Sequence, residues 1–500
     1  MDKNRVFSSR YIPPPGWKSL LVLCSVIIGI RLIFTGIMGI MPQDAYYYFY
    51  ASHLDLSYYD HPPMIAYLLR LFTTIFGKNV WAIKLADTLT TALSVFAFYH
   101  LAKKFLRERK ALTATALLLS TLMISILSLV STPDVPLVLC WILSLNFLYE
   151  AIWNKKNLYW VWAGLMTGLS FDSKYTGVFI LIGLIGFLII ARPYRKLLLN
   201  PWLFLYLLCF AITILPVVIW NMRNHFASFK FQSAGRVKEG IVFDPSGFAG
   251  VVGHQSAILL PILFFSLVYF IYRICKKYGF HFARIYTDQL FLLCFFIPLF
   301  LGFFALSFFY WVKINWMIPA YITGIIWVCR YWNKKWLRLQ LIISVVVHIA
   351  VAIEIAFYIV PVRSDDTWFG WKEFSTKVES VRKDYTNTFI FSSDDYKTSA
   401  ILNFYLNEMV YSKNVVGEKA LQFDFIGTDL KLLNGKDAIF IDSNPRFSSL
   451  ENENEHIPAF YHTYFDQIIP LNPILIEKNG KVDRKFSLFL CKNYHFKPAT

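Results

Sequence analysis

Charged side chains are scarce in this sequence. Asp, Glu, Lys and Arg make up 16% of the 500 residues, whereas hydrophobic residues make up 56%. The mean hydropathy of +0.48 excludes an ordinary soluble globular protein. Apolar runs of about 20 residues recur, which is the length needed to cross a hydrocarbon core of roughly 30 Å. The sequence therefore predicts a polytopic α-helical membrane protein.

Acidic residues are scarcest in the first part of the chain. Residues 1–361 carry 32 Lys and Arg but 13 Asp and Glu, while residues 362–500 carry 17 and 19. A net charge of +17 would suggest nucleic acid in a soluble protein, but the positive-inside rule explains an excess confined to the membrane part. We therefore predict no nucleic-acid partner, a transmembrane domain over residues 1–361 and a second domain over residues 362–500.

Cysteine motifs are also absent. Six of the seven cysteines fall in or beside apolar runs, and only Cys491 lies in the second domain. No CxxC or Cys/His spacing indicates a metal site, and no disulfide is expected within the second domain. The basic N-terminus precedes an apolar run over residues 19–41, which is too long for a signal peptide core of 7–15 residues. We interpret that run as the first transmembrane helix.

Eleven spans fit the apolar pattern. Six alternate basic segments hold 22 Lys and Arg and the loops between them hold 8, so the N-terminus is predicted to be cytoplasmic and the second domain outside. The two shortest spans flank a polar break at residues 172–175. Irregular backbone at membrane depth is tolerated only beside protein or a wet cavity, so a cavity is predicted there. The predicted spans are 19–41, 80–101, 111–130, 135–153, 158–172, 175–191, 198–219, 249–271, 289–309, 314–331 and 339–360.

The second domain has a different pattern. Apolar clusters shorten to strand length at residues 388–391, 438–441 and 486–490, with a helical pattern at residues 399–406 between the first two. This alternation predicts a small mixed α/β domain on the outer surface.

Polar side chains that could support chemistry gather at the predicted outer face. The first outer loop holds Asp44, several tyrosines and an Asp60-His61-Pro-Pro turn, and later loops supply mainly cations. Asp44 follows the first helix directly, where its carboxylate could face both water and membrane. One carboxylate opposite several cations suits phosphoryl-linked chemistry, because the cations hold an anionic leaving group while the carboxylate acts on the nucleophile.

At these residues the chain resembles a known family. The motifs occur in the family's order between residues 44 and 316. Together they are similar to the polyprenyl-phosphate-dependent glycosyltransferases of the GT-C superfamily, in the protein O-mannosyltransferase-like branch that includes the lipid A aminoarabinose transferase. The motifs are Asp44-Ala-Tyr-Tyr, Tyr59-Asp-His-Pro-Pro63, Thr132-Pro-Asp134, Ser173-Lys-Tyr-Thr176, Trp220-Asn221, Ser228-Phe-Lys-Phe-Gln232 with Arg236, and Asn315-Trp316.

The resemblance implies an inverting transfer of a sugar from a polyprenyl phosphate to an acceptor outside the membrane. Asp44 would orient or deprotonate the acceptor, with Asp60 and His61 as further catalytic candidates. Lys174, Arg236 and Lys313 would hold the donor phosphate. The side chains expected to line the substrates are Tyr47, Tyr59, Asp134, Tyr175, Asn221, Gln232, Asn315 and Trp316.

One departure bears on the acceptor. In the protein-modifying members Glu follows the first acid, whereas Ala45 follows Asp44 here. This favours an acceptor that is already nucleophilic, such as a lipid phosphate, and the resemblance indicates a glycolipid such as lipid A or its core. No cofactor is required by these residues. An alternative is that Asp44, Asp60 and Asp134 gather around a divalent cation.

Other functions fit some of these features. The acceptor could be a protein, or the chain could be a transporter or flippase of a lipid-linked sugar. A transporter should place its polar groups near the midplane and use both faces, whereas here they crowd one face. A receptor would leave the outer constellation without a purpose. The resemblance places the protein in a bacterial inner membrane, with its second domain in the periplasm.

Overall fold

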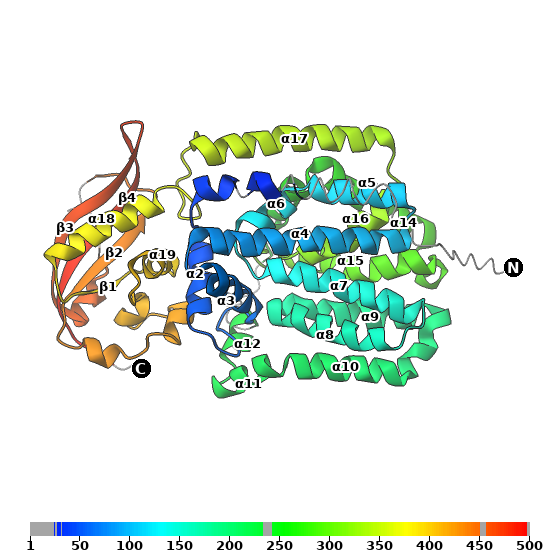
Figure 1. The fold of residues 1–500 in the computed structure, drawn as a ribbon, viewed down its shortest axis with the longest axis horizontal. Helices are drawn as coiled ribbons and strands as arrows, with labels where there is room; N and C mark the ends of the chain where they lie inside the picture. Colours follow the sequence, from blue (N-terminus) through cyan, green and yellow to red (C-terminus); the bar gives the residue numbers. More distant parts are fainter. Residues whose placement is uncertain (1–24, 26–27, 32, 234–242, 451–456, 498–500) are drawn as a thin grey trace.

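The computed structural model describes residues 25, 28–31, 33–233, 243–450 and 457–497. A long helical part is followed by a domain built on a four-stranded sheet, which lies at one end of the helices (Figure 1). The helices of the first part are α2 (Pro42–Ser52), α3 (Met64–Phe76), α4 (Val80–Phe105), α5 (Glu108–Leu119), α6 (Leu122–Leu129), α7 (Asp134–Ile152), α8 (Leu158–Ser173), α9 (Phe179–Ile190), α10 (Pro201–Thr213), α11 (Leu215–Arg223), α12 (Ala227–Gln232), α13 (Pro245–Leu259), α14 (Pro261–Tyr278), α15 (Thr287–Leu306), α16 (Ile318–Cys329) and α17 (Lys334–Phe357).

Four of these helices are each long and apolar enough to cross a membrane: α4, α7, α15 and α17. Four pairs of consecutive helices pass the same test jointly, although each pair is bent by more than 40°. By length and composition, the described residues thus hold four spans, or up to eight if each bent pair is one span. The predicted class, a polytopic helical membrane protein, is confirmed. The number of eleven spans stays a prediction.

The polar break predicted at residues 172–175 is confirmed. Helix α8 ends at Ser173, Lys174 has extended backbone, and a 3-10 turn, η1 (Tyr175–Val178), leads into α9. The turn passes so close to α8 that a Cβ at Gly177 would lie 2.4 Å from the backbone carbon of Ser170. A glycine at this position therefore permits the break.

The segment predicted as a span at residues 249–271 is interrupted by a sharp bend, and whether it crosses the membrane stays a prediction. Helix α13 ends at Leu259 and α14 begins at Pro261. The chain bends by 116° between the two helices. Leu260 between them has a φ of 65°, and Pro261 has no N–H with which to continue the hydrogen-bonded ladder. The spans predicted at 111–130 and 198–219 are also bent pairs, with angles of 62° and 43°.

The predicted first outer loop is largely helical, because it forms α2 and α3. Pro42 occupies the first turn of α2, where its missing N–H costs nothing. The carboxylate of Asp44 accepts a hydrogen bond of 2.8 Å from the Met41 backbone N–H and so satisfies one group at the helix start. The acid thus belongs to a helix terminus and not to a flexible loop.

The domain at the end of the helices has sheet order β1-β2-β4-β3, with β1 and β2 parallel and the other pairs antiparallel. The strands predicted at residues 388–391, 438–441 and 486–490 fall on β1, β2 and β4, and the helix at 399–406 falls in α19. These positions are confirmed. The elements are α18 (Trp371–Asp384), β1 (Phe389–Phe391), α19 (Lys397–Leu406), β2 (Ala438–Asn444), β3 (Phe465–Lys478) and β4 (Lys481–Tyr494).

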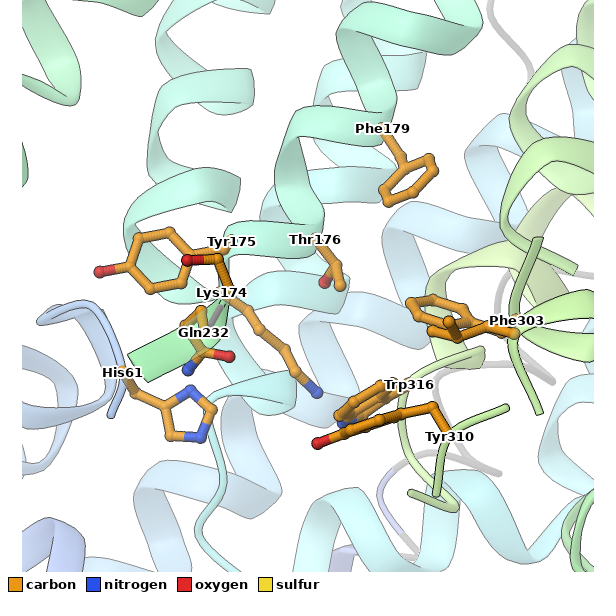
Figure 2. A pocket seen from close by; sticks show the side chains of 11 residues that line it. His61, Lys174, Tyr175, Thr176, Phe179, Gln232, Phe303, Tyr310 and Trp316 are labelled. Carbon is orange, nitrogen blue, oxygen red and sulfur yellow. The ribbon is translucent and has the colours of Figure 1, made fainter. Parts of the chain in front are cut away.

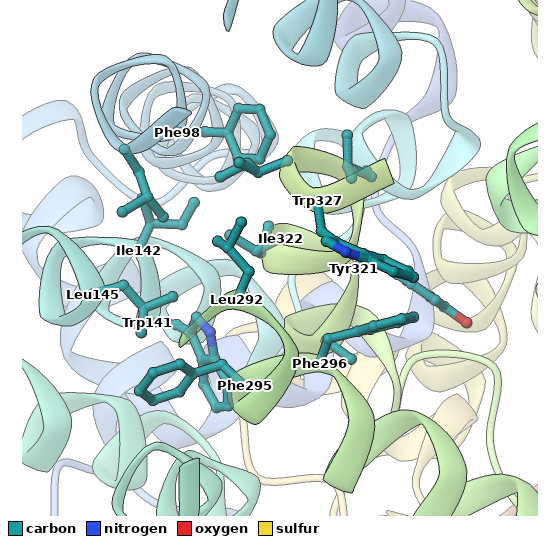
Figure 3. Packing of buried hydrophobic residues seen from close by; sticks show 14 of the residues in the cluster. Phe98, Trp141, Ile142, Leu145, Leu292, Phe295, Phe296, Tyr321, Ile322 and Trp327 are labelled. Atoms are coloured by element: carbon teal, nitrogen blue, oxygen red, sulfur yellow. The ribbon is translucent and has the colours of Figure 1, made fainter. Parts of the chain in front are cut away.

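Two large hydrophobic cores hold the chain together. One lies among the membrane helices, where Trp141 of α7, Phe295 of α15 and Trp327 of α16 are buried (Figure 3). The other is shared between the two parts: Phe49 of α2 stacks on Phe423 of the sheet domain, with ring centroids 4.5 Å apart. We call the sheet domain the outer domain, after its predicted location. Because this core includes side chains from α2, α3, α18, α19 and the sheet, the outer domain packs directly against α2 and α3.

Candidate active site

A cavity of about 400 Å³ lies beside the break between α8 and α9. Three of its lining residues are His61, Lys174 and Gln232, and Figure 2 shows the Lys174 side chain extending toward Trp316, with His61 and Gln232 on the other side. The remainder of the wall is mainly apolar and aromatic. A polar end beside an apolar end suits a lipid with a charged head group. The other lining residues are Tyr175, Thr176, Phe179, Ser233, Phe303, Leu306 and Tyr310.

Lys174 is held by an acid and reaches the cavity. Its ammonium group lies 2.9 and 3.0 Å from the two carboxylate oxygens of Asp134, the first residue of α7. The side-chain amide of Asn315 donates to the same carboxylate at 2.5 Å. The two side chains of the pair are almost completely buried. The structure thus brings together three predicted site residues from three distant segments, and of the three Lys174 lines the cavity.

His61 lies in the opposite wall, and Asp60 precedes it in the same turn without lining the cavity. The carboxylate of Asp60 accepts hydrogen bonds from the Tyr46 and Tyr50 hydroxyls, and its backbone carbonyl accepts one of 2.5 Å from Gln232. Burial and the neighbouring Asp60 carboxylate both raise the pKa of Tyr46, which keeps its hydroxyl protonated as a donor. Asp60 is therefore fixed by α2, and it holds the turn that presents His61 to the cavity.

Helix α12 connects this wall to the break. The Ser228 hydroxyl lies 2.6 Å from the Tyr175 hydroxyl, and Gln232 one turn later reaches Asp60. Asn221, at the end of α11, accepts a hydrogen bond from the backbone N–H of Phe229 at 3.1 Å. Asn221 is completely buried and does not line the cavity, so it positions the helix that carries Gln232.

Asp44 is not exposed to water, contrary to the prediction from the sequence. It is completely buried, and it forms an ion pair with the equally buried Lys84 of α4. Its other hydrogen bonds come from the backbone N–H groups of Met41 (2.8 Å) and Ser131 (2.7 Å). The physical reason is that the outer domain and α4 cover the start of α2. Asp44 does not line the cavity, but Ser131 stands three residues before Asp134, which holds Lys174.

The remaining predicted residues lie at different distances from the cavity. Tyr47 is buried against the His61 ring, with centroids 6.0 Å apart. Tyr59 faces the outer domain, where its backbone N–H donates to Gln422 at 2.7 Å. Lys313 is exposed and does not line the cavity. Arg236, predicted to bind phosphate, lies outside the described residues.

The sequence did not predict Lys84 or several of the residues that line the cavity. Lys84 carried a signal, since a lysine within an apolar run requires a partner, but that partner, Asp44, is 40 residues away. Apolar lining residues such as Phe179 and Phe303 have no such signal in the sequence. The hydropathy pattern is the same for a side chain that lines a cavity and for one that faces lipid. Within the described residues, no group of three His, Cys, Asp or Glu side chains could hold a metal ion. Asp44, Asp60 and Asp134 each have separate partners.

Comparison with known proteins finds similarity to glycosyltransferases in sequence and to solved structures in fold. Residues 60–220 match the family model described as dolichyl-phosphate-mannose-protein mannosyltransferase. This range includes His61, Asp134 and Lys174. The lipid A galacturonosyltransferase RgtD of Rhizobium johnstonii is 25% identical over 315 residues, which cover 60% of this chain and 63% of that protein. This chain therefore matches less than two thirds of that relative's length.

A second relative is similar to part of the chain, and two solved structures share its fold. The undecaprenyl phosphate-alpha-4-amino-4-deoxy-L-arabinose arabinosyl transferase of Pseudomonas aeruginosa is 31% identical over 127 residues, 24% of this chain and 23% of that protein. The crystal structure of ArnT from Cupriavidus metallidurans in the apo state matches with a TM-score of 0.61 and 13% identity, over 95% of this chain and 98% of that chain. Its complex with undecaprenyl phosphate gives 0.60 over the same shares. The fold is therefore shared over nearly the whole chain.

Proposed function

We propose that this chain, which belongs to the GT-C superfamily, is an inverting glycosyltransferase that moves a sugar from a polyprenyl phosphate to a glycolipid acceptor of the lipid A class. The cavity carries the proposal. A lysine fixed by a buried carboxylate stands at its polar end, while Phe179, Phe303 and Leu306 line the apolar remainder. A polyprenyl phosphate fits this arrangement, because its charged phosphate can lie at the polar end and its isoprenoid chain along the apolar wall.

In this mechanism the ammonium of Lys174 compensates the negative charge of the leaving phosphate. The acceptor attacks the anomeric carbon and forms the new glycosidic bond, and the bond to the donor phosphate breaks on the opposite face. The phosphate monoester leaves with the electron pair, and the ammonium of Lys174 stabilises its growing negative charge. His61 and Gln232 face the same space from the other wall and would fix the head group there (Figure 2).

Asp44 remains our candidate for handling the acceptor, on the strength of the family motif. In the present arrangement its carboxylate is occupied by Lys84 and two backbone N–H groups. Catalysis by Asp44 therefore requires that the acceptor reach it by displacing one of these donors. The alternative role is purely structural, because the same contacts tie α2 to the segment that leads to Asp134.

The relatives support a lipid as acceptor and an undecaprenyl phosphate as donor carrier. One relative bears the name lipid A galacturonosyltransferase, another is named for an undecaprenyl phosphate-linked aminoarabinose, and one solved structure of the same fold binds undecaprenyl phosphate. We further propose the inner membrane as the location, with the N-terminus in the cytoplasm and the outer domain in the periplasm. The alternation of basic loops supports this orientation.

Binding of undecaprenyl phosphate to the purified full chain tests the donor site. We expect His61→Ala and Lys174→Met each to weaken binding by about tenfold or more, because charged hydrogen bonds contribute roughly 1.5–3 kcal/mol. Lys313→Met is the matched control and should bind as the wild type does, since Lys313 is exposed and outside the cavity. Equal loss in the control, or none in the two cavity variants, would reject this placement of the phosphate.

Intact-lipid mass spectrometry of cells lacking the protein, and of cells complemented with the wild type or Lys174→Met, tests the transfer itself. A sugar mass on a glycolipid that needs the wild-type chain and is missing with the variant supports the proposed function. Identical glycolipids in all strains would show that the acceptor is not a lipid.

A further inference from the structure

A second hollow lies where the outer domain meets the membrane helices. Two adjoining cavities of about 710 and 560 Å³ share four wall residues, Gly36, Gly39, Lys372 and Tyr405. We call their union the outer groove. Its walls come from the end of the first described helix (Ile28–Met38), the start of α4, the end of α17, and α18 and α19 of the outer domain. None of its residues lines the cavity of about 400 Å³ that contains Lys174, which we call the donor cavity after its proposed ligand.

Three lysines give the outer groove a positive charge. The ammonium of Lys78 donates to the side-chain amide oxygen of Asn407, and that of Lys478 donates to the backbone carbonyls of Phe357 and Tyr358. These acceptors are neutral. Within the described part of the chain, neither these two lysines nor Lys372 forms an ion pair with a carboxylate. Partial burial lowers the pKa of Lys78, as expected for an ammonium without a counter-charge.

The acidic residue in the wall does not neutralise this charge. Glu373 is paired at 2.8 Å with Lys377 on the next turn of α18. Lys372 itself lies in the first turn of α18, where the helix dipole disfavours a cation. The start of α18 also has no side-chain cap, since Gly370 precedes it. Lys372 and the uncapped backbone N–H groups at this helix start together form a favourable site for an anion.

The outer groove opens onto surfaces suited to lipid. Helix α17 is the least buried of the four long apolar helices, with 17% of its apolar window inside the protein. Ile33 and Ile37 of the first described helix and Phe357 at the end of α17 are largely exposed, with 68, 50 and 64% of their surface accessible. A lipid whose head group enters the groove can therefore lay its acyl chains along these helices.

The segment that lines the outer groove leads directly into α2. Figure 1 shows α17 and α18 on one side of α2, with α11 and α12 on the other. Gly39 and Ile40 line the groove, and the chain enters α2 immediately afterwards, at the turn that carries Asp44. The segment that directly follows the groove wall thus contains Asp44, the acid assigned to the acceptor by the family motif.

We propose that the outer groove binds the phosphate-bearing head group of the lipid acceptor. The inference rests on the proposed function, in which the acceptor is a glycolipid. The lysines compensate the phosphate charge, the aromatic and glycine surfaces accommodate the sugar, and the acyl chains remain in the outer leaflet. Donor and acceptor then approach α2 from opposite sides.

Binding to the full chain in nanodiscs tests the proposal without requiring turnover. The probes are an acylated glucosamine disaccharide bisphosphate and the same lipid without its phosphates. We expect the bisphosphate to bind at least tenfold more tightly, and Lys372→Gln to remove most of this difference. Gly36→Leu should block the lipid with and without phosphates, because no protein atom lies within 4 Å of a Cβ there and the added side chain enters the groove. Lys383→Gln on the same helix, outside the groove, is the matched control.

Three outcomes would overturn the proposal: equal binding of the lipid with and without phosphates, equal effects of Lys372→Gln and Lys383→Gln, or full displacement of the bisphosphate by equimolar phosphatidylglycerol. Undecaprenyl phosphate binding, measured on the same variants, should stay unchanged. We expect Lys174→Met to lose undecaprenyl phosphate binding and still to bind the acceptor lipid. The proposed donor site and the proposed acceptor groove are thus tested separately.

Discussion

At the scale of residues, two buried ammonium–carboxylate pairs distinguish the helical part. Lys174–Asp134 lies at the cavity beside the break between α8 and α9, and Lys84–Asp44 does not line that cavity. Ser131 connects the two regions through its backbone contact with Asp44. Removing one member of a buried pair leaves an uncompensated charge, which costs about 3–5 kcal/mol. A lost activity in such a variant can therefore reflect lost folding as well as lost chemistry.

The double variant Asp44→Asn/Lys84→Met separates these two effects. We expect Asp44→Asn alone to lower the free energy of unfolding by about 3–5 kcal/mol, since the ammonium of Lys84 loses its counter-ion. The double variant removes both charges and should recover most of that stability, measured by thermal unfolding of the full chain in detergent.

Sugar transfer by the double variant then decides the role of Asp44. A stable but inactive protein supports direct participation of the carboxylate in catalysis. Near wild-type transfer would assign Asp44 a structural role only, in holding α2 against α4.

At the scale of elements, the break between α8 and α9 places the cavity lysine. Lys174 is extended because the chain leaves one helix and enters a 3-10 turn, and Gly177 allows that turn to rest on the backbone of α8. The sequence motif Ser-Lys-Tyr-Thr indicated a break here, but it did not indicate that the lysine would meet Asp134 from α7.

Gly177→Ala should displace this turn. The added Cβ would lie 2.4 Å from backbone atoms of α8, which cannot rotate away as a side chain could. We expect a loss of about 1–3 kcal/mol in stability together with weaker undecaprenyl phosphate binding.

The matched control is Gly186→Ala in α9, where a Cβ meets no atom within 4 Å. It should be neutral or stabilising by up to about 1 kcal/mol, because alanine favours a helix more than glycine. Similar behaviour of the two variants in thermal unfolding and donor binding would show that the close approach at Gly177 is unimportant.

At the scale of the whole molecule, the outer domain and the membrane helices are joined by one core. Tyr46 of α2 stacks on Tyr396 of the outer domain with ring centroids 4.3 Å apart, and Gln43 donates to Asp366 at 2.7 Å. Two residues before Tyr396 lies Asp394, whose neighbour Asp442 accepts hydrogen bonds from Ser393. A change in the protonation of Asp394 and Asp442 should therefore affect the stability of the entire chain.

The unfolding temperature of the full chain should rise as the pH falls from 7 toward 5. Burial, with repulsion between neighbouring carboxylates, raises the pKa of Asp394 and Asp442 above the ordinary range. The folded chain then binds more protons than the unfolded chain between the unfolded and folded pKa values. Stability from these groups is thus greatest below the unfolded pKa and declines as the pH rises through the folded pKa.

Asp442→Asn should flatten this pH dependence, because it removes one of the charges while retaining hydrogen bonds to Ser393. Asp466→Asn is a suitable control, since Asp466 is exposed on the same sheet. An unfolding temperature that falls between pH 7 and 5 in the wild type, with the same slope in Asp442→Asn, would contradict the assignment.

The sequence by itself determined the class of the protein, the positions of most helices and strands and the polar break. These follow from local patterns: hydropathy over about 20 residues, alternation of basic loops, and the strand-length clusters of the outer domain. The membrane imposes this locality, because each spanning segment must satisfy its own backbone hydrogen bonds. The motif order likewise indicated the superfamily.

Only the tertiary structure decided which side chains meet. Asp44 pairs with Lys84, Lys174 with Asp134 and Gln232 with Asp60, and the partners in these contacts stand 40 to 172 residues apart in the chain. The burial of Asp44 depends on α4 and on the outer domain covering α2, which no local pattern encodes. The outer groove exists only because the two parts of the chain share a core, so its charge and shape belong to the assembled molecule.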